Sequence, residues 1–155
     1  MRIAINGFGR IGKLVFRAFL EKKIKNAEIV AINELGSIES SIHLLKYDTV
    51  HGILPFNVKK IKNGINVNNN KIKFFAERDP LNLPWKNLNI DIVLECSGVF
   101  TSREKAELHI KSGAKKVIIS APATDIDMTV VQGVNNHQLS KKHNIISNGS
   151  CTTNC

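Results

Sequence analysis

The chain begins with MRIAINGFGRIG (residues 1–12), in which a short apolar run leads into three glycines with the spacing G-x-G-x-x-G. The apolar run, Ile3 to Ile5, is typical of a buried strand. Apolar residues beyond the glycines recur at the spacing of one helix face, at Ile11, Leu14, Val15, Ala18 and Phe19. The stretch therefore predicts a strand, a glycine turn and a helix, the order in which dinucleotide phosphates are bound.

Each glycine of this turn has a physical role in a phosphate site. Gly7 permits the tight turn, Gly9 lets the backbone approach a pyrophosphate, and Gly12 lets the helix pack closely on the strand. Free N–H groups and the helix dipole would then face the phosphates. The alternative is an ordinary turn between a strand and a helix, because glycines also mark such turns.

Composition places the chain among ordinary globular proteins. Its 155 residues suffice for one domain, and 43% are hydrophobic. The formal charge of +9 comes from dispersed lysines without interleaved aromatics, which favours a solvated basic surface over a nucleic-acid site. Three cysteines are too few for a disulfide scaffold and fit a reducing cytosol. We see no signal peptide and no apolar run near the roughly 20 residues that cross a bilayer, so we expect no membrane partner.

Two charged residues are candidates for cofactor contacts beyond the glycine turn. Glu34 follows a predicted strand over Ala27–Asn33, about 20 residues past the glycines, where an acid binds the adenine ribose. The alternative is a loop carboxylate in water. Arg78 follows a predicted strand over Lys71–Ala76, and it could equally reach a cofactor or be a surface charge.

Strands and helices alternate along the chain, which predicts an α/β fold: a Rossmann-type, doubly wound, mostly parallel sheet with an antiparallel hairpin insertion at Asn57–Asn68. A capping box is predicted at Thr101–Glu104, with Thr101 as the helix cap. The candidate residues fall at predicted carboxyl ends of strands, where ligands of such sheets bind. They are Gly7, Glu34, Arg78, the run Cys96–Gly98, and Ser120.

The chain closes on SNGSCTTNC (residues 147–155), small polar residues that predict the start of a helix after a buried strand. The N–H groups there would favour the thiolate of Cys151 and hold an oxyanion, which suggests aldehyde oxidation through a thioester. We expect Cys96 to be a buried mid-strand hydrophobe, and Cys155 to face the core and react slowly. The alternative is a metal site formed by Cys151, Cys155, His137 and His143. The spacing of these residues matches no usual zinc signature.

Four motifs together resemble the phosphorylating glyceraldehyde-3-phosphate dehydrogenase family: INGFGRIG (5–12), LLKYDTVHG (44–52), GAKKVIISAP (113–122) and SCTTNC (150–155). The resemblance covers the whole chain. It implies an NAD-dependent glycolytic enzyme, usually a cytoplasmic homotetramer, that acts on an aldehyde phosphate and inorganic phosphate. It also implies an NAD-binding domain over residues 1–149, with residues 150–155 beginning a catalytic domain. The matching site residues are Cys151 as nucleophile; Arg10, Ile11, Glu34, Arg78 and Ser120 as cofactor contacts; and Ser150 and Thr152 as substrate contacts.

The sequence also departs from the family pattern. Glu34 stands where the family more often has aspartate, and a glutamate at this position is common in the similar erythrose-4-phosphate dehydrogenases. Gly149 stands where alanine is usual. The family is about twice as long, and no histidine here matches the motif of its base, so these residues alone should not turn over aldehyde. The five histidines are His43, His51, His109, His137 and His143. A non-catalytic dinucleotide- or RNA-binding module is the alternative from another class.

Overall fold

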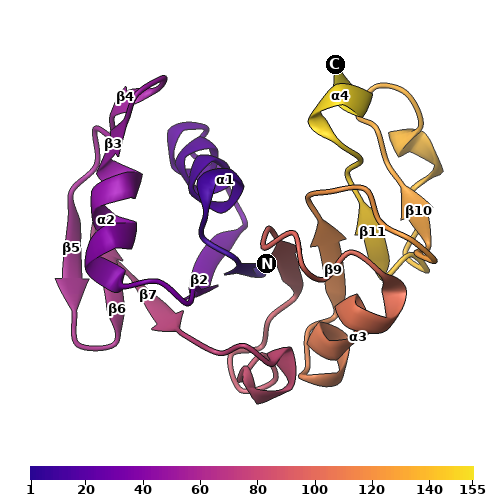
Figure 1. Ribbon diagram of the computed structural model, residues 1–155, viewed down its shortest axis with the longest axis horizontal. Helices are drawn as coiled ribbons and strands as arrows, with labels where there is room; N and C mark the ends of the chain where they lie inside the picture. The colour runs from indigo at the N-terminus through magenta and orange to yellow at the C-terminus, as the bar shows by residue number, and fades with distance from the viewer.

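The computed structural model describes residues 1–155 and contains one nine-stranded sheet, flanked by helices on both faces (Figure 1). The strand order is β10-β11-β9-β8-β1-β2-β7-β6-β5, in which β6 pairs antiparallel with both of its neighbours and every other pair is parallel. The predicted doubly wound fold with an antiparallel hairpin insertion is confirmed.

The elements of the main sheet and its flanking helices have the following bounds. The helices are α1 (Arg10–Glu21), α2 (Ile38–Lys46), α3 (Arg103–Lys111) and α4 (Cys151–Asn154), with 3-10 turns η1 (Pro80–Asn82) and η2 (Asn136–Gln138). The strands are β1 (Arg2–Asn6), β2 (Glu28–Asn33), β5 (Val58–Ile61), β6 (Gly64–Val67), β7 (Asn70–Phe75), β8 (Ile92–Glu95), β9 (Lys116–Ile119), β10 (Met128–Thr129) and β11 (Ile145–Ser147).

The order of strands places a reversal at the centre of the sheet. From β1 the chain winds outward through β2 to β7, and it then returns to place β8 on the other side of β1. The last residue of β1, Asn6, pairs with Asn33 at the end of β2 and with Glu95 at the end of β8. In open α/β sheets this reversal opens a crevice at the carboxyl ends of the strands, where ligands bind.

Alternation along the strands explains the two-sided core. Ile3 and Ile5 of β1 pack in the cluster that contains Phe16 of α1 and Leu45 of α2. Ala4, which points to the opposite face, packs in the cluster around Trp85. Both faces of β1 are thus buried, which explains why the strand reads as a continuous apolar run rather than as an alternating one.

The start of α3 differs from the prediction. The helix begins at Arg103, and its cap is Ser102, whose Oγ accepts a hydrogen bond from the Lys105 N–H at 3.4 Å. The carbonyl of Thr101 accepts from the Thr124 N–H at 3.0 Å, so the backbone of Thr101 is engaged by the neighbouring loop. The prediction of Thr101 as the cap was therefore wrong by one residue, because a contact distant in sequence decides where the helix begins.

A small hairpin lies in the connection after α2. Residues 46–52 (KYDTVHG) are mostly polar and by themselves predict a plain connection, but Tyr47–Asp48 (β3) and Gly52–Ile53 (β4) form an antiparallel pair. Asp48 closes its turn, because its Oδ1 accepts from the N–H groups of Val50 and His51 at 2.9 and 2.8 Å. This local side-chain bond is typical of aspartate in turns.

Asp127 joins three segments at the far edge of the sheet, and its replacement should destabilise the fold. Its Oδ2 accepts from the Asn144 and Ile145 N–H groups at 2.7 and 2.9 Å, and its Oδ1 pairs with Arg103 at 2.5 Å. Partial burial raises the pKa of Asp127, but the backbone donors and the Arg103 guanidinium outweigh this effect. Together they lower the pKa of Asp127 from 3.8 to about 2.

Because the folded pKa lies below the unfolded one, this stabilisation is present above about pH 4 and is lost as the pH falls toward about 2. We expect Asp127→Asn to lower the free energy of unfolding by about 1–2 kcal/mol at pH 7, and by roughly half as much at pH 3. Urea unfolding at the two pH values measures both differences. Asp125→Asn is the control, because Asp125 contacts Arg103 through its backbone oxygen. An equal loss at both pH values would contradict the assignment.

Candidate functional site

A cavity of about 370 Å³ lies at the carboxyl ends of the central strands. Four segments line it: the glycine turn after β1, residues 33–35 at the end of β2, residues 77–78 after β7, and residues 96–100 after β8. The cavity therefore lies at the reversal of strand order, and it brings together Gly7, Gly9, Glu34 and Arg78 as the sequence predicted for one site.

Two of the three glycines are required by the packing of the turn itself. Gly7 has a φ of +85°, and a Cβ there would lie 2.5 Å from the backbone of Ser97. A Cβ on Gly12 would lie 2.2 Å from the carbonyl oxygen of Gly7. Residues with side chains cannot be accommodated at these distances, so these glycines allow the strand, the turn and α1 to pack closely.

Gly9 is different, because nothing lies within 4 Å of the position that its Cβ would take. It is the N-cap of α1, its φ is −74°, and no side chain caps this end of the helix. The open space in front of Gly9 and the N–H groups of the first turn of α1 therefore form a cradle suited to an anion.

The side chains of Arg10 and Ile11 turn away from this cradle. Arg10 pairs with Asp48, and the side chain of Ile11 is exposed. Neither residue lines the cavity. Both lie in the first turn of α1 beside Gly12, so the parts of these residues that remain available to a phosphate are their backbone N–H groups.

Glu34 is held directly beside the glycine turn. Its Oε2 accepts a hydrogen bond from the Phe8 N–H at 2.6 Å, and its Oε1 accepts from the Gly36 N–H at 3.0 Å. The carboxylate is therefore fixed at the wall of the cavity, and it is not a loop carboxylate free in water. Arg78 lines the same cavity from the segment that follows β7.

The cysteine segment lies apart from this cavity, on the side of the sheet that carries β11 (Figure 1). The predicted helix start is present: α4 begins at Cys151, and Ser150 caps it by accepting from the Thr153 N–H at 3.0 Å. Thr152 lies in the same turn, and its hydroxyl is 2.8 Å from the Ser150 Oγ. Cys151 is exposed, and so is Cys155, which overturns the expectation that Cys155 faces the core.

Cys96 lines the cavity, and Ser120 lies next to it. Strand β8 ends at Glu95, so Cys96 follows the strand rather than lying in the middle of it, and it is half-buried. Burial raises the pKa of the Cys96 thiol to about 11, and a hydrogen bond with Ser120 offsets part of the shift. The N–H of Ser120 donates to the carbonyl of Glu95 at 2.9 Å, which ties the end of β9 to that of β8.

No group of three or more His, Cys, Asp and Glu side chains comes together in a way that could hold a metal ion. No helix has the length and apolar character that crossing a membrane requires.

Sequence reasoning overlooked the polar residues that end the central strands. Asn6, Asn33 and Glu95 are the last residues of β1, β2 and β8, and all three are buried. One signal in the sequence could have indicated them, because each ends an apolar run with a polar residue at the same register. A polar residue in that position is expensive to bury unless its hydrogen bonds are satisfied.

The fold and the cavity together define a dinucleotide-binding domain of the Rossmann class. The parallel sheet reverses its order at the cavity, and a glycine turn leads into a helix whose N-terminus carries no side-chain cap. An acidic side chain, that of Glu34, directly follows the neighbouring strand, at the position that contacts a ribose in this class.

Comparison with known proteins defines the family. Residues 1–103 match the family model described as "Glyceraldehyde 3-phosphate dehydrogenase, NAD binding domain". Over 153 residues, 99% of this chain and 46% of the relative, the chain is 56% identical to a glyceraldehyde-3-phosphate dehydrogenase of Thermotoga maritima. Over its whole length, and 46% of the relative's, it is 51% identical to a glyceraldehyde-3-phosphate dehydrogenase of Xanthobacter flavus.

The chain belongs to the glyceraldehyde-3-phosphate dehydrogenase NAD-binding domain family, and its cofactor is NAD. The chain spans about half the length of the relatives it matches, 46% in both cases.

Proposed function

We propose that this chain is the NAD-binding part of a phosphorylating glyceraldehyde-3-phosphate dehydrogenase, with residues 1–149 as the cofactor domain and 150–155 as the start of the catalytic domain. The observation that carries the proposal is the cavity that joins the glycine turn, Glu34 and Arg78, in a chain more than half identical to such enzymes. NAD, when bound, supplies a hydride acceptor for aldehyde oxidation.

The residues at the cavity suit the parts of NAD. The open space at Gly9 leaves room for a pyrophosphate, and the N–H groups of Arg10, Ile11 and Gly12 would hold it. The carboxylate of Glu34 would accept hydrogen bonds from the hydroxyls of the adenine ribose. Two further residues would complete the cofactor contacts of the domain, Arg78 and Ser120.

The segment around α4 would carry the chemistry on the substrate. Cys151 is exposed at the first position of α4, so its sulfur is open to an aldehyde. As a thiolate it would add to the aldehyde carbon. Loss of a hydride from that carbon to NAD, and of the proton from its hydroxyl group, would leave a thioester on the sulfur. Inorganic phosphate would then release the acyl group as an acyl phosphate and return the thiolate. Ser150 and Thr152 flank this sulfur and would contact the substrate.

We also propose assembly with further copies, as a homotetramer of the full-length protein in the cytoplasm. Exposed apolar side chains gather on the first turn of α1, the end of α2 and the β3–β4 hairpin, and this supports the proposal. They include Ile11, Leu44, Val50 and Ile53, which are 48%, 52%, 75% and 67% exposed. The three free cysteines fit a reducing compartment.

Steady-state rates on glyceraldehyde 3-phosphate and erythrose 4-phosphate, with and without phosphate, test this activity in the enzyme that contains these residues. We expect the first aldehyde to be preferred and the rate to depend on phosphate. A preference for erythrose 4-phosphate, with release of the free acid, would contradict the proposed substrate. It would identify the enzyme instead as an erythrose-4-phosphate dehydrogenase, the alternative that Glu34 suggests. Salt-sensitive RNA binding without NAD binding would instead favour a non-catalytic module.

The position of Glu34 predicts a preference for NAD over NADP. Its carboxylate lies beside the Phe8 N–H, where a 2′-phosphate on the ribose would meet its negative charge. We expect NAD to bind at least about tenfold more tightly than NADP, and Glu34→Ala to narrow the gap. Calorimetric titration of both cofactors measures the ratio, and Glu39→Ala on the exposed face of α2 is the control. Equal affinities in the unmodified protein would show that Glu34 does not select the cofactor.

A further inference from the structure

We propose that Glu95 is a positioning residue: its buried carboxylate holds the segments around the cofactor cavity in the geometry that binds NAD. The inference rests on the proposed function, because it assigns a role to the wall of the same cavity. Glu95 ends β8, next to Asn6 at the reversal of strand order, and is only 1% exposed. The assigned site does not use this acidic group, although burying it is costly unless its oxygens are satisfied.

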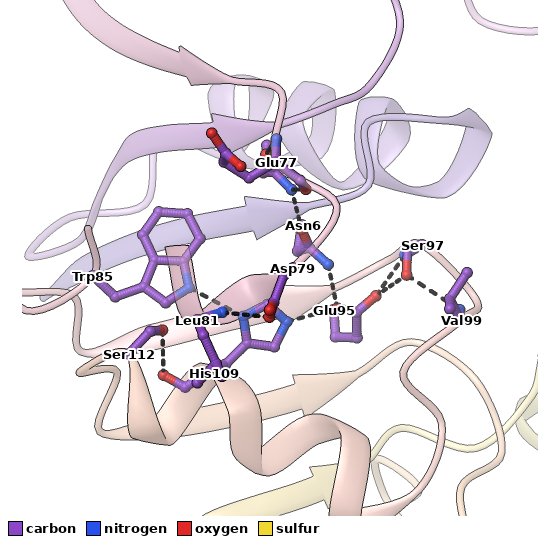
Figure 2. Close-up of polar contacts among 11 residues, drawn as sticks. Asn6, Glu77, Asp79, Leu81, Trp85, Glu95, Ser97, Val99, His109 and Ser112 are labelled. Carbon is purple, nitrogen blue, oxygen red and sulfur yellow. Dashed lines mark hydrogen bonds and ion pairs between the residues drawn. The ribbon is translucent and has the colours of Figure 1, made fainter. Parts of the chain in front are cut away.

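Both oxygens of Glu95 accept hydrogen bonds (Figure 2). Oε2 lies 2.6 Å from Nδ2 of Asn6 and 2.9 Å from Nε2 of His109. Oε1 accepts from the N–H of Ser97 at 2.8 Å and from the hydroxyl of the same residue. A carboxylate that meets four donors acts as an acceptor only, so every group around it must present a hydrogen.

The direction of the bonds on one side is set from outside the network. The backbone N–H of Glu77 can only donate, and it donates to Oδ1 of Asn33 at 2.9 Å. Nδ2 of Asn33 must then face Oδ1 of Asn6, at 2.7 Å. This leaves Nδ2 of Asn6 pointing at Glu95. The backbone N–H of Glu77 therefore fixes the orientation of both amide groups, from the segment after β7 to the end of β8.

The other side is set in the same way. The indole N–H of Trp85 can only donate, and it donates to Nδ1 of His109 at 3.0 Å. The hydrogen of this buried imidazole therefore lies on Nε2, which donates to Glu95. The Ser97 Oγ accepts from the Val99 N–H at 3.1 Å, which directs its own hydrogen toward Glu95. Glu95 is the acceptor on which donors from both sides converge.

The network reaches every segment that lines the cavity. Its members at the wall are Asn6 before Gly7, Asn33 before Glu34, Glu77 before Arg78, and Ser97 in the turn after β8. The anchor is His109 of α3, which is 0% exposed. Glu95 itself does not line the cavity, so its effect on a cofactor would pass through the loops that it holds.

The variant Glu95→Gln tests the proposal. It keeps the shape of the side chain but replaces one acceptor oxygen of the carboxylate by an NH₂ group, which is a donor. Its amide NH₂ must face the donors of Asn6 and His109, or those of Ser97, so at least one pair of donors is opposed. We expect the Kd for NAD to rise by about tenfold or more at a temperature at which circular dichroism shows a folded protein. Titration calorimetry of the unmodified protein and the variant measures this change.

Two controls separate positioning from general stability. Glu107→Gln makes the same chemical change on the exposed face of α3, and Asp127→Asn weakens the far edge of the sheet. Both should bind NAD within about twofold of the unmodified protein. If folded Glu95→Gln also stays within this range, the role is structural only and the proposal is overturned.

If Glu95→Gln does not fold, Ser97→Ala decides instead, because it removes one hydroxyl donor and keeps the carboxylate. We expect a loss of about threefold to tenfold in NAD affinity, and unchanged affinity would overturn the proposal. The tautomer of His109 in the unliganded protein, read from its ¹⁵N chemical shifts, gives a second readout. We expect Nε2–H in the unmodified protein and a changed signal in Glu95→Gln. Absence of NAD binding by the unmodified protein would overturn the proposed function, whereas an Nδ1–H tautomer would overturn the network.

Discussion

Gly9→Val should abolish NAD binding, with a loss of at least about 100-fold in affinity, while the protein stays folded. The backbone of Gly9 has a φ of −74°, which a residue with a side chain can adopt, and nothing lies within 4 Å of the Cβ position. The fold therefore tolerates the side chain. It would instead occupy the space before the first turn of α1, where a pyrophosphate needs to approach the N–H groups.

Gly12→Ala is the matched contrast, because the smaller side chain meets a crowded position. Its Cβ would lie 2.2 Å from the Gly7 carbonyl oxygen, so the strand, turn or helix must shift. We expect this variant to lose stability, whereas Gly9→Val loses affinity at nearly unchanged stability. Thermal unfolding and calorimetric titration of both variants measure the separation. Unchanged NAD affinity in folded Gly9→Val would show that the glycine turn is only structural.

Alkylation should separate the three cysteines by their surroundings. Cys151 and Cys155 are exposed, whereas Cys96 is half-buried with a thiol pKa raised from 9.0 to about 11. Two pH units lower the thiolate fraction at neutral pH about 100-fold, and the thiolate is the species that reacts. We expect Cys151 to react first, because it begins α4, and Cys96 to react at least about 100-fold more slowly.

Iodoacetamide labelling at pH 7 with mass-spectrometric mapping measures the order. Labelling in denaturant is the control, since the three thiols should then react at similar rates. The rate at Cys96 should continue to rise as the pH approaches about 11, because its thiolate fraction rises over that range. Native labelling of Cys96 as fast as Cys151 would contradict the assignment of an inert thiol at the cavity wall and a reactive thiol at the start of α4.

Local sequence patterns were sufficient for the main architecture. The glycine spacing, the apolar runs and the helix periodicity predicted the strand–turn–helix unit, the doubly wound sheet and the hairpin insertion. Gly7, Gly9, Glu34 and Arg78 were predicted for one site and do line one cavity. The fold predictions succeed because turn geometry and apolar runs act between residues that are close in the chain. The predicted apolar face of α1 was wrong, because Ile11 and Ala18 are exposed. The buried residues of this helix are Gly12, Lys13, Phe16 and Arg17.

Other features depended on contacts between residues far apart in sequence. The cap of α3 is Ser102, because the loop at Thr124 engages the backbone of Thr101.

By itself, then, the sequence determined the class of fold, the glycine turn after the first strand and four of the residues that line the cavity at the strand ends. Only the tertiary structure decided that Asn6, Asn33 and Glu95 meet at one edge of the sheet, and that His109 lies behind them. The physical reason is that strand register and strand order bring these side chains together. A buried carboxylate is stable only where distant donors converge on it, and that convergence has no local sequence pattern.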